Sequence, residues 1–303
     1  MLKYSIKRII LAAVTVFIIA AITFFAMNAI PGGPFAKEKA SEPRIRAVLE
    51  KRFNLDKPVG EQFVLYLRNF FQGDFGVSTK TGREISTTIF TSFSVSARLG
   101  GMAVLTALVF GLILGSVAAL MRGKWPDRVI IFFTTFFVSV PSFILATLLL
   151  LVFSLQLGWF PVWTPANPNY TLPVIALALY PMAYITRLTK SSMLDVLGQD
   201  YIRTARAKGV REQLVIFKHA LRNALIPVIT YVGPLTAYIL TGSLVVETVF
   251  NIGGLGTHFV TGINNRDYPM IMGTTLFLAT LMVMMTLISD LLYKAIDPKI
   301  TFD

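Results

Sequence analysis

The sequence contains no cysteine and only two histidines, His219 and His258, among its 303 residues. Without thiols the chain cannot form disulfides, thiolate metal sites or a cysteine nucleophile, and two histidines are too few for a histidine-rich metal centre. It also lacks the phosphate-binding pattern G-x-x-x-x-G-K-[ST], the serine-nucleophile pattern G-x-S-x-G and the zinc-binding pattern H-E-x-x-H. We therefore predict no catalytic residue, no metal site and no cofactor in this chain.

Charged residues are also scarce. They make up 15% of the chain, against about 25% in soluble domains, while AVILMFWYC make up 54%. A soluble fold of this size would leave large apolar patches exposed, which excludes an ordinary soluble enzyme. The remaining charges are mostly positive, with 28 Lys and Arg against 16 Asp and Glu and a net charge of +12. Such a balance is typical of chains that contact nucleic acid or an anionic membrane surface.

Five stretches of the chain carry no charged residue. A helix needs about 20 apolar residues to cross a bilayer, and a charge at its centre costs at least about 2.5 kcal/mol. The third stretch has 58 residues, enough for two crossings, and a Pro-rich turn with two tryptophans lies in its middle. We predict an all-α integral membrane protein with six transmembrane helices, the first over residues 9–30. The uncharged stretches are residues 9–36, 99–121, 129–186, 223–246 and 268–289.

The basic residues Lys3, Lys7 and Arg8 in front of the first span would also fit a secretory signal peptide. The apolar run of the first span is longer than the roughly 7 to 15 residues of a signal peptide, and five further spans follow the first. These features favour an uncleaved anchor that follows a tail of residues 1–8.

The Lys and Arg residues of the short connections predict the orientation. Sixteen of them lie in the two terminal tails and in the connections 122–128 and 187–222, whereas one lies in the connections 157–169 and 247–267. Because basic connections stay inside, we expect both termini to be cytoplasmic. This asymmetry accounts for most of the net charge, and no basic face with base-stacking residues is evident, so nucleic-acid binding is not expected.

Residues 31–96 are too long and too mixed in charge to be a simple connection, and we interpret them as an extracytoplasmic helical segment. The apolar spacing predicts one helix over residues 41–53 and another after Pro58, with Phe63 and Leu67 on its apolar stripe. This cap either receives a partner protein or shields a pore mouth.

The connection between spans four and five predicts a short projecting helix. Span four is expected to continue to about Leu197 and to stop at Gly198. We expect Asp200 to cap a short amphipathic helix, which ends where Gly209 takes the left-handed conformation. From the residues alone, a basic helix that rests on anionic lipid is favoured over one that contacts a partner.

Small residues recur every four positions along span two, which lets another backbone approach closely, either within the chain or from a second subunit. At the outer ends of spans two and five, Arg98 and Glu247 are candidates for an ion pair across a gate, although snorkelling at the interface explains them equally well. The small residues are Ala103, Ala107, Gly111, Gly115 and Ala119, of which Ala107, Gly111 and Gly115 are the central packing candidates.

Residues 200–209 read DYIRTARAKG and residues 219–228 read HALRNALIPV. Together with the motifs below, they resemble the cytoplasmic signature of inner-membrane permeases in peptide-importing ABC transporters. The motifs are highly specific as a set and cover nearly the whole chain in family order. Within that family the chain is most similar to oligopeptide permeases, with dipeptide and nickel permeases as alternatives. The further motifs are DKPV at 56–59, GDFG at 73–76, VETVF at 246–250, GGLG at 253–256, NRDY at 265–268 and DPK at 297–299.

The resemblance implies a MetI-like permease core of five helices over residues 97–303, in the cytoplasmic membrane of a bacterium. It also implies that residues 187–223 form a coupling segment that sits in a groove of an ATPase subunit. The wider importer superfamily has Glu-Ala-Ala before the glycine of this segment, whereas the aligned residues here include Arg203, so a Glu-based contact is not available. The residues implied to make the contact are Tyr201, Arg203, Thr204, Ala205, Lys208 and Gly209.

The partners implied by the resemblance are a second homologous permease, two ATPase subunits that bind ATP and Mg, an extracytoplasmic peptide-binding protein and membrane lipids. The chain itself would then supply half of the peptide pathway. A stand-alone secondary transporter is the rival interpretation, but it needs a coupling-ion site of buried ionisable residues, and none is evident in the spans. A membrane-anchored scaffold is disfavoured because the predicted spans hold most of the mass.

Overall fold

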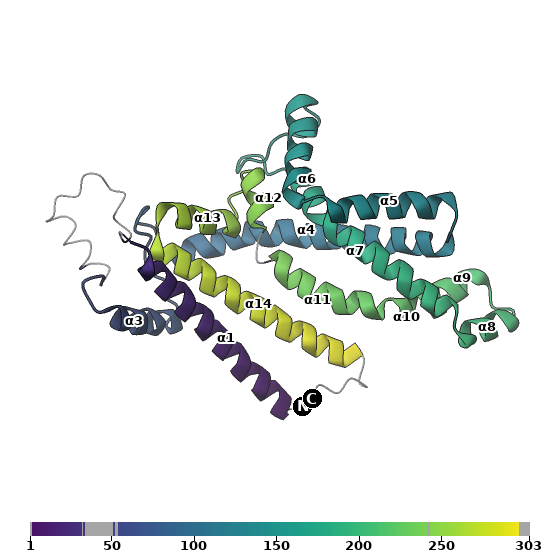
Figure 1. Ribbon diagram of the computed structural model, residues 1–303, viewed down its shortest axis with the longest axis horizontal. Coiled ribbons are helices and arrows are strands. Elements are labelled where there is room, and N and C mark those ends of the chain that lie inside the picture. Colours follow the sequence, from purple (N-terminus) through teal and green to yellow (C-terminus); the bar gives the residue numbers. More distant parts are fainter. Residues whose placement is uncertain (1, 32, 34–50, 52–53, 241–242, 297–303) are drawn as a thin grey trace. The chain divides into compact units, whose positions relative to one another are not determined.

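The computed structural model describes residues 2–31, 33, 51, 54–240 and 243–296. Within these residues the secondary structure is helical, apart from one isolated antiparallel bridge between Val77 and Glu84. The chain forms two compact units, Met1–Val95 with Gly253–Met284 and Ser96–Ile252 with Met285–Asp303. It passes from one unit to the other within α4 (Ile85–Leu120), between Ile252 and Gly253, and within α14 (Tyr268–Ile296). Helices of both units are labelled in Figure 1.

Unit one is built on the contact between its first and last helices, which run side by side in Figure 1. Phe24 and Met27 of the first helix pack on Met272 and Leu276 of the last, and all four side chains are buried. The helices of this unit are α1 (Leu2–Ala29), α3 (Val59–Phe71), the beginning of α4 (Ile85–Leu120), α13 (Leu255–Asn265) and the beginning of α14 (Tyr268–Ile296).

Helix α3 lies where the sequence predicts a helix after Pro58, and it packs on α1 through aromatic rings. The ring of the buried Phe63 lies 5.2 Å from that of Phe24 and 5.4 Å from that of Phe25, measured between centroids. Tilted rings at this separation stabilise a contact beyond the area that they bury. The other predicted helix, at residues 41–53, lies outside the described residues apart from Lys51.

Three consecutive residues at the start of α14 tie the segments of unit one together. Arg266 Nη1 donates to the carbonyl of Pro31 at 3.0 Å, and Tyr268 Oη donates to the carbonyl of Met27, also at 3.0 Å. Between them, the buried Asp267 accepts hydrogen bonds from Ser78 Oγ at 2.5 Å and from the backbone N–H of Thr79 at 3.0 Å. These contacts join the start of α14 to the end of α1, to the residues just after it and to the turn at Ser78. We call Arg266, Asp267 and Tyr268 the clasp.

Unit two contains most of the remaining helices. Helix α5 follows α4 after a short turn and contacts α7, and both are labelled in Figure 1. Its elements are the rest of α4, α5 (Trp125–Ser139), α6 (Ser142–Leu149), the π-helix η1 (Leu150–Gln156), α7 (Thr171–Leu197), α8 (Asp200–Ala207), α9 (Glu212–Leu214), the π-helix η2 (Val215–Leu221), α10 (Arg222–Ala224), α11 (Ile226–Leu240) and α12 (Leu244–Val249).

Five helices in the described residues are long and apolar enough to cross a membrane, and a sixth span is reached when α5 is joined to α6 and η1. The prediction of an all-α membrane protein is confirmed, with the third span broken by a bend of 104°. The break lies at Pro141, which has no N–H to donate and forces the preceding Val140 out of the helical region, to φ −87° and ψ 128°.

The small residues of α4 lie against α7 within unit two. A methyl group added at Gly111 would lie 2.7 Å from Ile185 Cγ2, and one added at Gly115 would lie 2.6 Å from the carbonyl oxygen of Thr186. Ala107, which lies one turn before Gly111 in α4, is fully buried. The two backbones therefore approach closely at this ridge, and the contact is internal to the chain.

We predict that Gly111→Leu destabilises the protein because the larger side chain would overlap Ile185. Overpacking of this kind costs about 1–3 kcal/mol, which should appear as a lower Tm of the detergent-solubilised protein. Gly101→Leu is the matched control, since a side chain at Gly101 of the same helix meets nothing within 4 Å. Equal Tm values for the two variants would contradict the close approach of α4 and α7.

Candidate functional site

One buried side chain anchors the short helix α8 to the rest of unit two. Ile202 is fully buried in a cluster with Ala119 of α4, Met193 of α7 and Val215 of η2. Burial of such a side chain contributes about 1.5–3 kcal/mol, enough to fix a helix of eight residues that could not persist alone. The cluster thereby connects α8 to the ends of two long helices.

The amino-terminal end of α8 differs in detail from the sequence prediction. Asp200, predicted as the cap, is the first helical residue, and Gln199 occupies the N-cap position, where its side chain makes no capping hydrogen bond. The Asp200 carboxylate lies 3.5 Å from Arg203 Nη1, and the Thr204 hydroxyl donates to the Asp200 carbonyl at 2.9 Å. A carboxylate in the first turn still interacts favourably with the helix dipole.

The carboxyl-terminal end of α8 confirms the left-handed conformation predicted at Gly209, which has φ +74°. The Gly209 N–H donates to the Arg206 carbonyl at 2.9 Å, and the Val210 N–H donates to the Ala205 carbonyl at 3.2 Å. These two bonds form a Schellman motif, in which a glycine avoids the strain that a Cβ would bring. Helix α7 ends at Leu197, as predicted.

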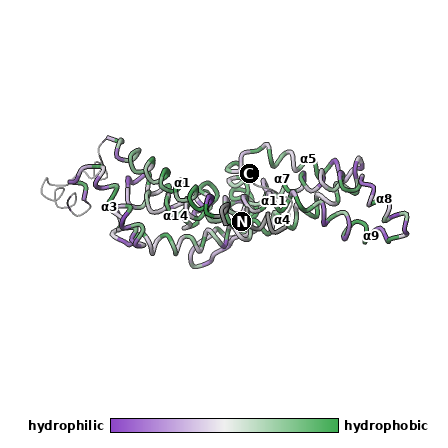
Figure 2. The backbone as a smooth tube through the Cα atoms, turned by 90° about the horizontal axis from the view of Figure 1, so that it is seen from below, coloured by the Kyte–Doolittle hydropathy of each residue, from purple (hydrophilic) through white to green (hydrophobic). Residues whose placement is uncertain are grey.

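The predicted coupling residues lie along α8 and the turn that follows it, and Ala205 among them packs against the cluster that buries Ile202. Tyr201, Arg203, Thr204, Lys208 and Gly209 are exposed, and Ala205 is half-buried. Figure 2 shows the hydrophilic residues of α8 and α9 at one end of unit two, beyond the hydrophobic middles of α5 and α7. Five of the six residues are therefore exposed to solvent, and Ala205 is in part a packing residue.

Two contacts join α8 to the residues that follow it in the chain. The hydroxyl of Tyr201 accepts a hydrogen bond from Asn223 Nδ2 at 2.8 Å. Arg206 donates to both carboxylate oxygens of Glu212, at 2.7 and 3.2 Å, and this hydrogen bonding raises the pKa of Arg206 and lowers the pKa of Glu212. The pair is exposed, so its effect on stability is small, but it fixes the turn after Gly209.

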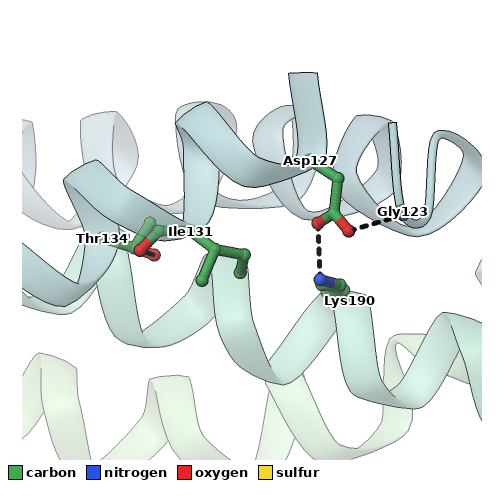
Figure 3. Close-up of polar contacts among 5 residues, drawn as sticks. All are labelled: Gly123, Asp127, Ile131, Thr134 and Lys190. Carbon is green, nitrogen blue, oxygen red and sulfur yellow. Dashed lines mark hydrogen bonds and ion pairs between the residues drawn. The ribbon is translucent and has the colours of Figure 1, made fainter. Parts of the chain in front are cut away.

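A buried ion pair lies between α5 and α7, and sequence reasoning missed it (Figure 3). Lys190 Nζ lies 2.5 Å from Asp127 Oδ1, and the other carboxylate oxygen accepts the Gly123 N–H at 2.9 Å. Asp127 is 7% exposed and the Lys190 side chain is 19% exposed. The sequence shows only that each residue flanks an uncharged stretch, which does not reveal that they meet.

The candidate gate residues are not joined by an ion pair in the described part of the chain. Glu247 is fully buried in α12, and its carboxylate accepts a hydrogen bond from Ser96 Oγ at 2.7 Å. Arg98 lies two positions further along α4, with its side chain exposed. The structure thus brings Ser96, and not Arg98, to Glu247.

No group of three or more His, Cys, Asp or Glu side chains in the described residues is placed to hold a metal ion. The candidate site therefore consists of a helix surface and its supports.

Comparisons with known proteins cover the whole chain. Residues 111–302 match the family described as "Binding-protein-dependent transport system inner membrane component", and residues 1–99 match its amino-terminal counterpart. The chain is 45% identical to a dipeptide transport system permease protein, DppB, of Bacillus subtilis, over 99% of this chain and 98% of the relative. It is 41% identical to an oligopeptide transport system permease protein, OppB, of Haemophilus influenzae, over 100% of both chains.

Among solved structures, a crystal structure of an amino acid ABC transporter with histidines has a TM-score of 0.50. The similarity covers 71% of this chain and 95% of that chain at 19% sequence identity. At this level of identity, the similarity concerns the fold alone.

We predict that Asp127→Asn destabilises the protein because it leaves the Lys190 ammonium buried without a carboxylate. Removing one partner of a buried pair costs at most about 3–5 kcal/mol, and the partial exposure of Lys190 reduces this. The double variant Asp127→Asn with Lys190→Met should recover part of the lost Tm. Asp200→Asn, which breaks an exposed pair, is the control and should leave the Tm nearly unchanged. Equal Tm values for Asp127→Asn and Asp200→Asn would show that the Asp127–Lys190 pair contributes nothing to stability.

Proposed function

Because the chain belongs to the family of binding-protein-dependent transport system inner membrane components, we propose that it is a permease subunit of an ATP-binding-cassette importer for oligopeptides. It forms half of the pathway, and separate ATPase subunits bind ATP and Mg. The chain is a transport component rather than an enzyme.

One observation carries the choice of cargo, namely the full-length similarity to peptide permeases. The relative from Haemophilus influenzae is named for oligopeptide transport. Dipeptides are the second candidate cargo, because the relative from Bacillus subtilis, at 45% identity, is named for dipeptide transport.

The proposed partners are a second homologous permease, two ATPase subunits, an extracytoplasmic peptide-binding protein and membrane lipids. Both termini are cytoplasmic in this proposal, residues 31–96 are extracytoplasmic and residues 97–303 form the permease core. The excess of Lys and Arg in the connections 122–128 and 187–222 supports this orientation.

We propose that α8 couples ATP binding to movement of the core. The surface formed by Tyr201, Arg203, Thr204, Ala205, Lys208 and Gly209 sits in a groove of an ATPase subunit. Closure of the ATPase dimer then displaces α8, and the buried Ile202 transmits the displacement to the ends of α4 and α7. The coupling requires that α8 contacts the ATPase differently in the inward-open and outward-open states.

Uptake of a labelled oligopeptide into vesicles that contain all partners tests this function, and we expect uptake only with ATP. Gly209→Val should abolish it, because a β-branched residue in the left-handed region costs roughly 1–2 kcal/mol and distorts the end of α8. Ala205→Glu should do the same by placing a charge at the docked surface. Gly209→Asn, which tolerates the left-handed conformation, is the control.

Both loss-of-uptake variants should insert normally into the membrane but co-purify poorly with the ATPase subunits. Normal uptake and co-purification in Gly209→Val and Ala205→Glu would overturn the coupling assignment. Peptide uptake without ATP by this chain alone would instead favour a secondary transporter.

The proposed orientation predicts which introduced cysteines a membrane-impermeant maleimide can reach. The chain has no cysteine of its own, so Gly60→Cys and Arg211→Cys each provide a single thiol at an exposed position. In intact cells the reagent should label Gly60→Cys, and it should label Arg211→Cys only after permeabilisation. The opposite labelling pattern would show that the chain has the inverse orientation in the membrane.

A further inference from the structure

Unit one contains a pocket of about 310 Å³ between the end of α1, helix α3, the turn after α3 and the start of α14. This volume lies at the lower end of the range for small-molecule sites, about 300–1,000 Å³. Apolar side chains form much of its wall, including Phe24, Met27, Phe75 and Met272.

A buried hydroxyl in the pocket wall lacks a partner. Tyr66 Oη is buried and makes no hydrogen bond within the described residues. Burial, with a smaller effect from the nearby Asp74 carboxylate, raises the pKa of Tyr66, so the phenol stays protonated at neutral pH. A buried polar group without a partner destabilises the folded state, and a ligand that bonds to this hydroxyl would remove that cost.

The wall offers several acceptors, although the amides of Asn54 and Asn69 also bring donors. Gln62 Nε2 donates to the Lys57 carbonyl at 2.8 Å and Asn28 Nδ2 donates to the Phe24 carbonyl at 2.9 Å, which leaves the two amide oxygens for other donors. Asp74 Oδ1 accepts the Gly76 N–H at 2.8 Å, which leaves the second carboxylate oxygen. The pocket wall includes this one carboxylate and no Lys, Arg or His among its described residues.

A ligand that fits this wall carries a positively charged donor group next to an apolar group. A primary ammonium satisfies the carboxylate and the amide oxygens, because it offers three donors and no acceptor. An apolar group beside it is needed to fill the space against Phe24, Met27 and Met272. The amino-terminal residue of a peptide has both features.

We propose that this pocket binds the amino-terminal end of a peptide, with its ammonium group at Asp74 and its first side chain against the apolar wall. This inference rests on the proposed function, in which α3 faces the side from which peptide arrives. The pocket would then hold the leading end of the cargo at the outer end of the permease.

The test uses the complete transporter in lipid nanodiscs and a tripeptide whose first residue is photo-leucine, a small apolar photoreactive analogue. After illumination, mass spectrometry should locate the label in α1 and α3 near the pocket, and unlabelled tripeptide should compete with it. The same tripeptide with an acetylated amino terminus should label the pocket roughly two- to fivefold less, the range expected for a partly exposed ion pair.

Two variants separate the contributions of the pocket wall. Asp74→Asn should remove the difference between the free and acetylated peptides, while its side-chain oxygen still accepts the Gly76 N–H. Tyr66→Phe should reduce labelling by both peptides by roughly two- to tenfold, as expected for one lost hydrogen bond. Asp56→Asn is the matched control, because Asp56 is exposed in the same unit and does not line the pocket. Tm measurements on each variant check that unit one remains folded.

The proposal is overturned if wild-type protein labels equally with free and acetylated peptide, or if a photoreactive lipid labels the pocket and the peptide does not. Parallel measurement of ATP-driven uptake separates this result from the proposed function. Uptake without pocket labelling would overturn the pocket assignment and leave the function standing. Pocket labelling without ATP-driven uptake would support the pocket assignment and overturn the function.

Discussion

The close approach of α4 and α7 is the constraint on which unit two depends. Gly111 and Gly115 have no side chain to separate the two backbones, so Ile185 and Thr186 of α7 fit directly against α4. A membrane offers little hydrophobic gain when two helices associate, so this packing must come from close van der Waals contact. Small residues at a spacing of four make that contact possible along the whole face of the helix.

The same contact determines where the polar end of the unit lies. The last member of the small-residue ridge, Ala119, belongs to the cluster that buries Ile202, so α8 sits where α4 and α7 meet. The ion pair between Asp127 and Lys190 joins α5 to α7 as well. A displacement of α8 therefore acts on three packed helices rather than on one flexible connection.

Patterns local in the sequence predicted much of this structure. The uncharged stretches predicted the spans because each charge inside a bilayer costs free energy. Gly209 predicted the end of α8 because the left-handed conformation of a glycine is a local property. Contacts between distant segments were not predictable. The partner of Glu247 depends on how α4 and α12 are rotated, which no spacing encodes, and Ser96 rather than Arg98 meets its carboxylate. The 104° angle at Pro141 likewise depends on the packing around the break, although the break itself follows from proline chemistry.

The clasp has a consequence for how the pocket of unit one behaves. The carbonyl of Met27 and the turn at Ser78 and Thr79 are bound by Tyr268 and Asp267, which are adjacent in the chain. A shift of that short stretch would therefore move two segments of the pocket wall together.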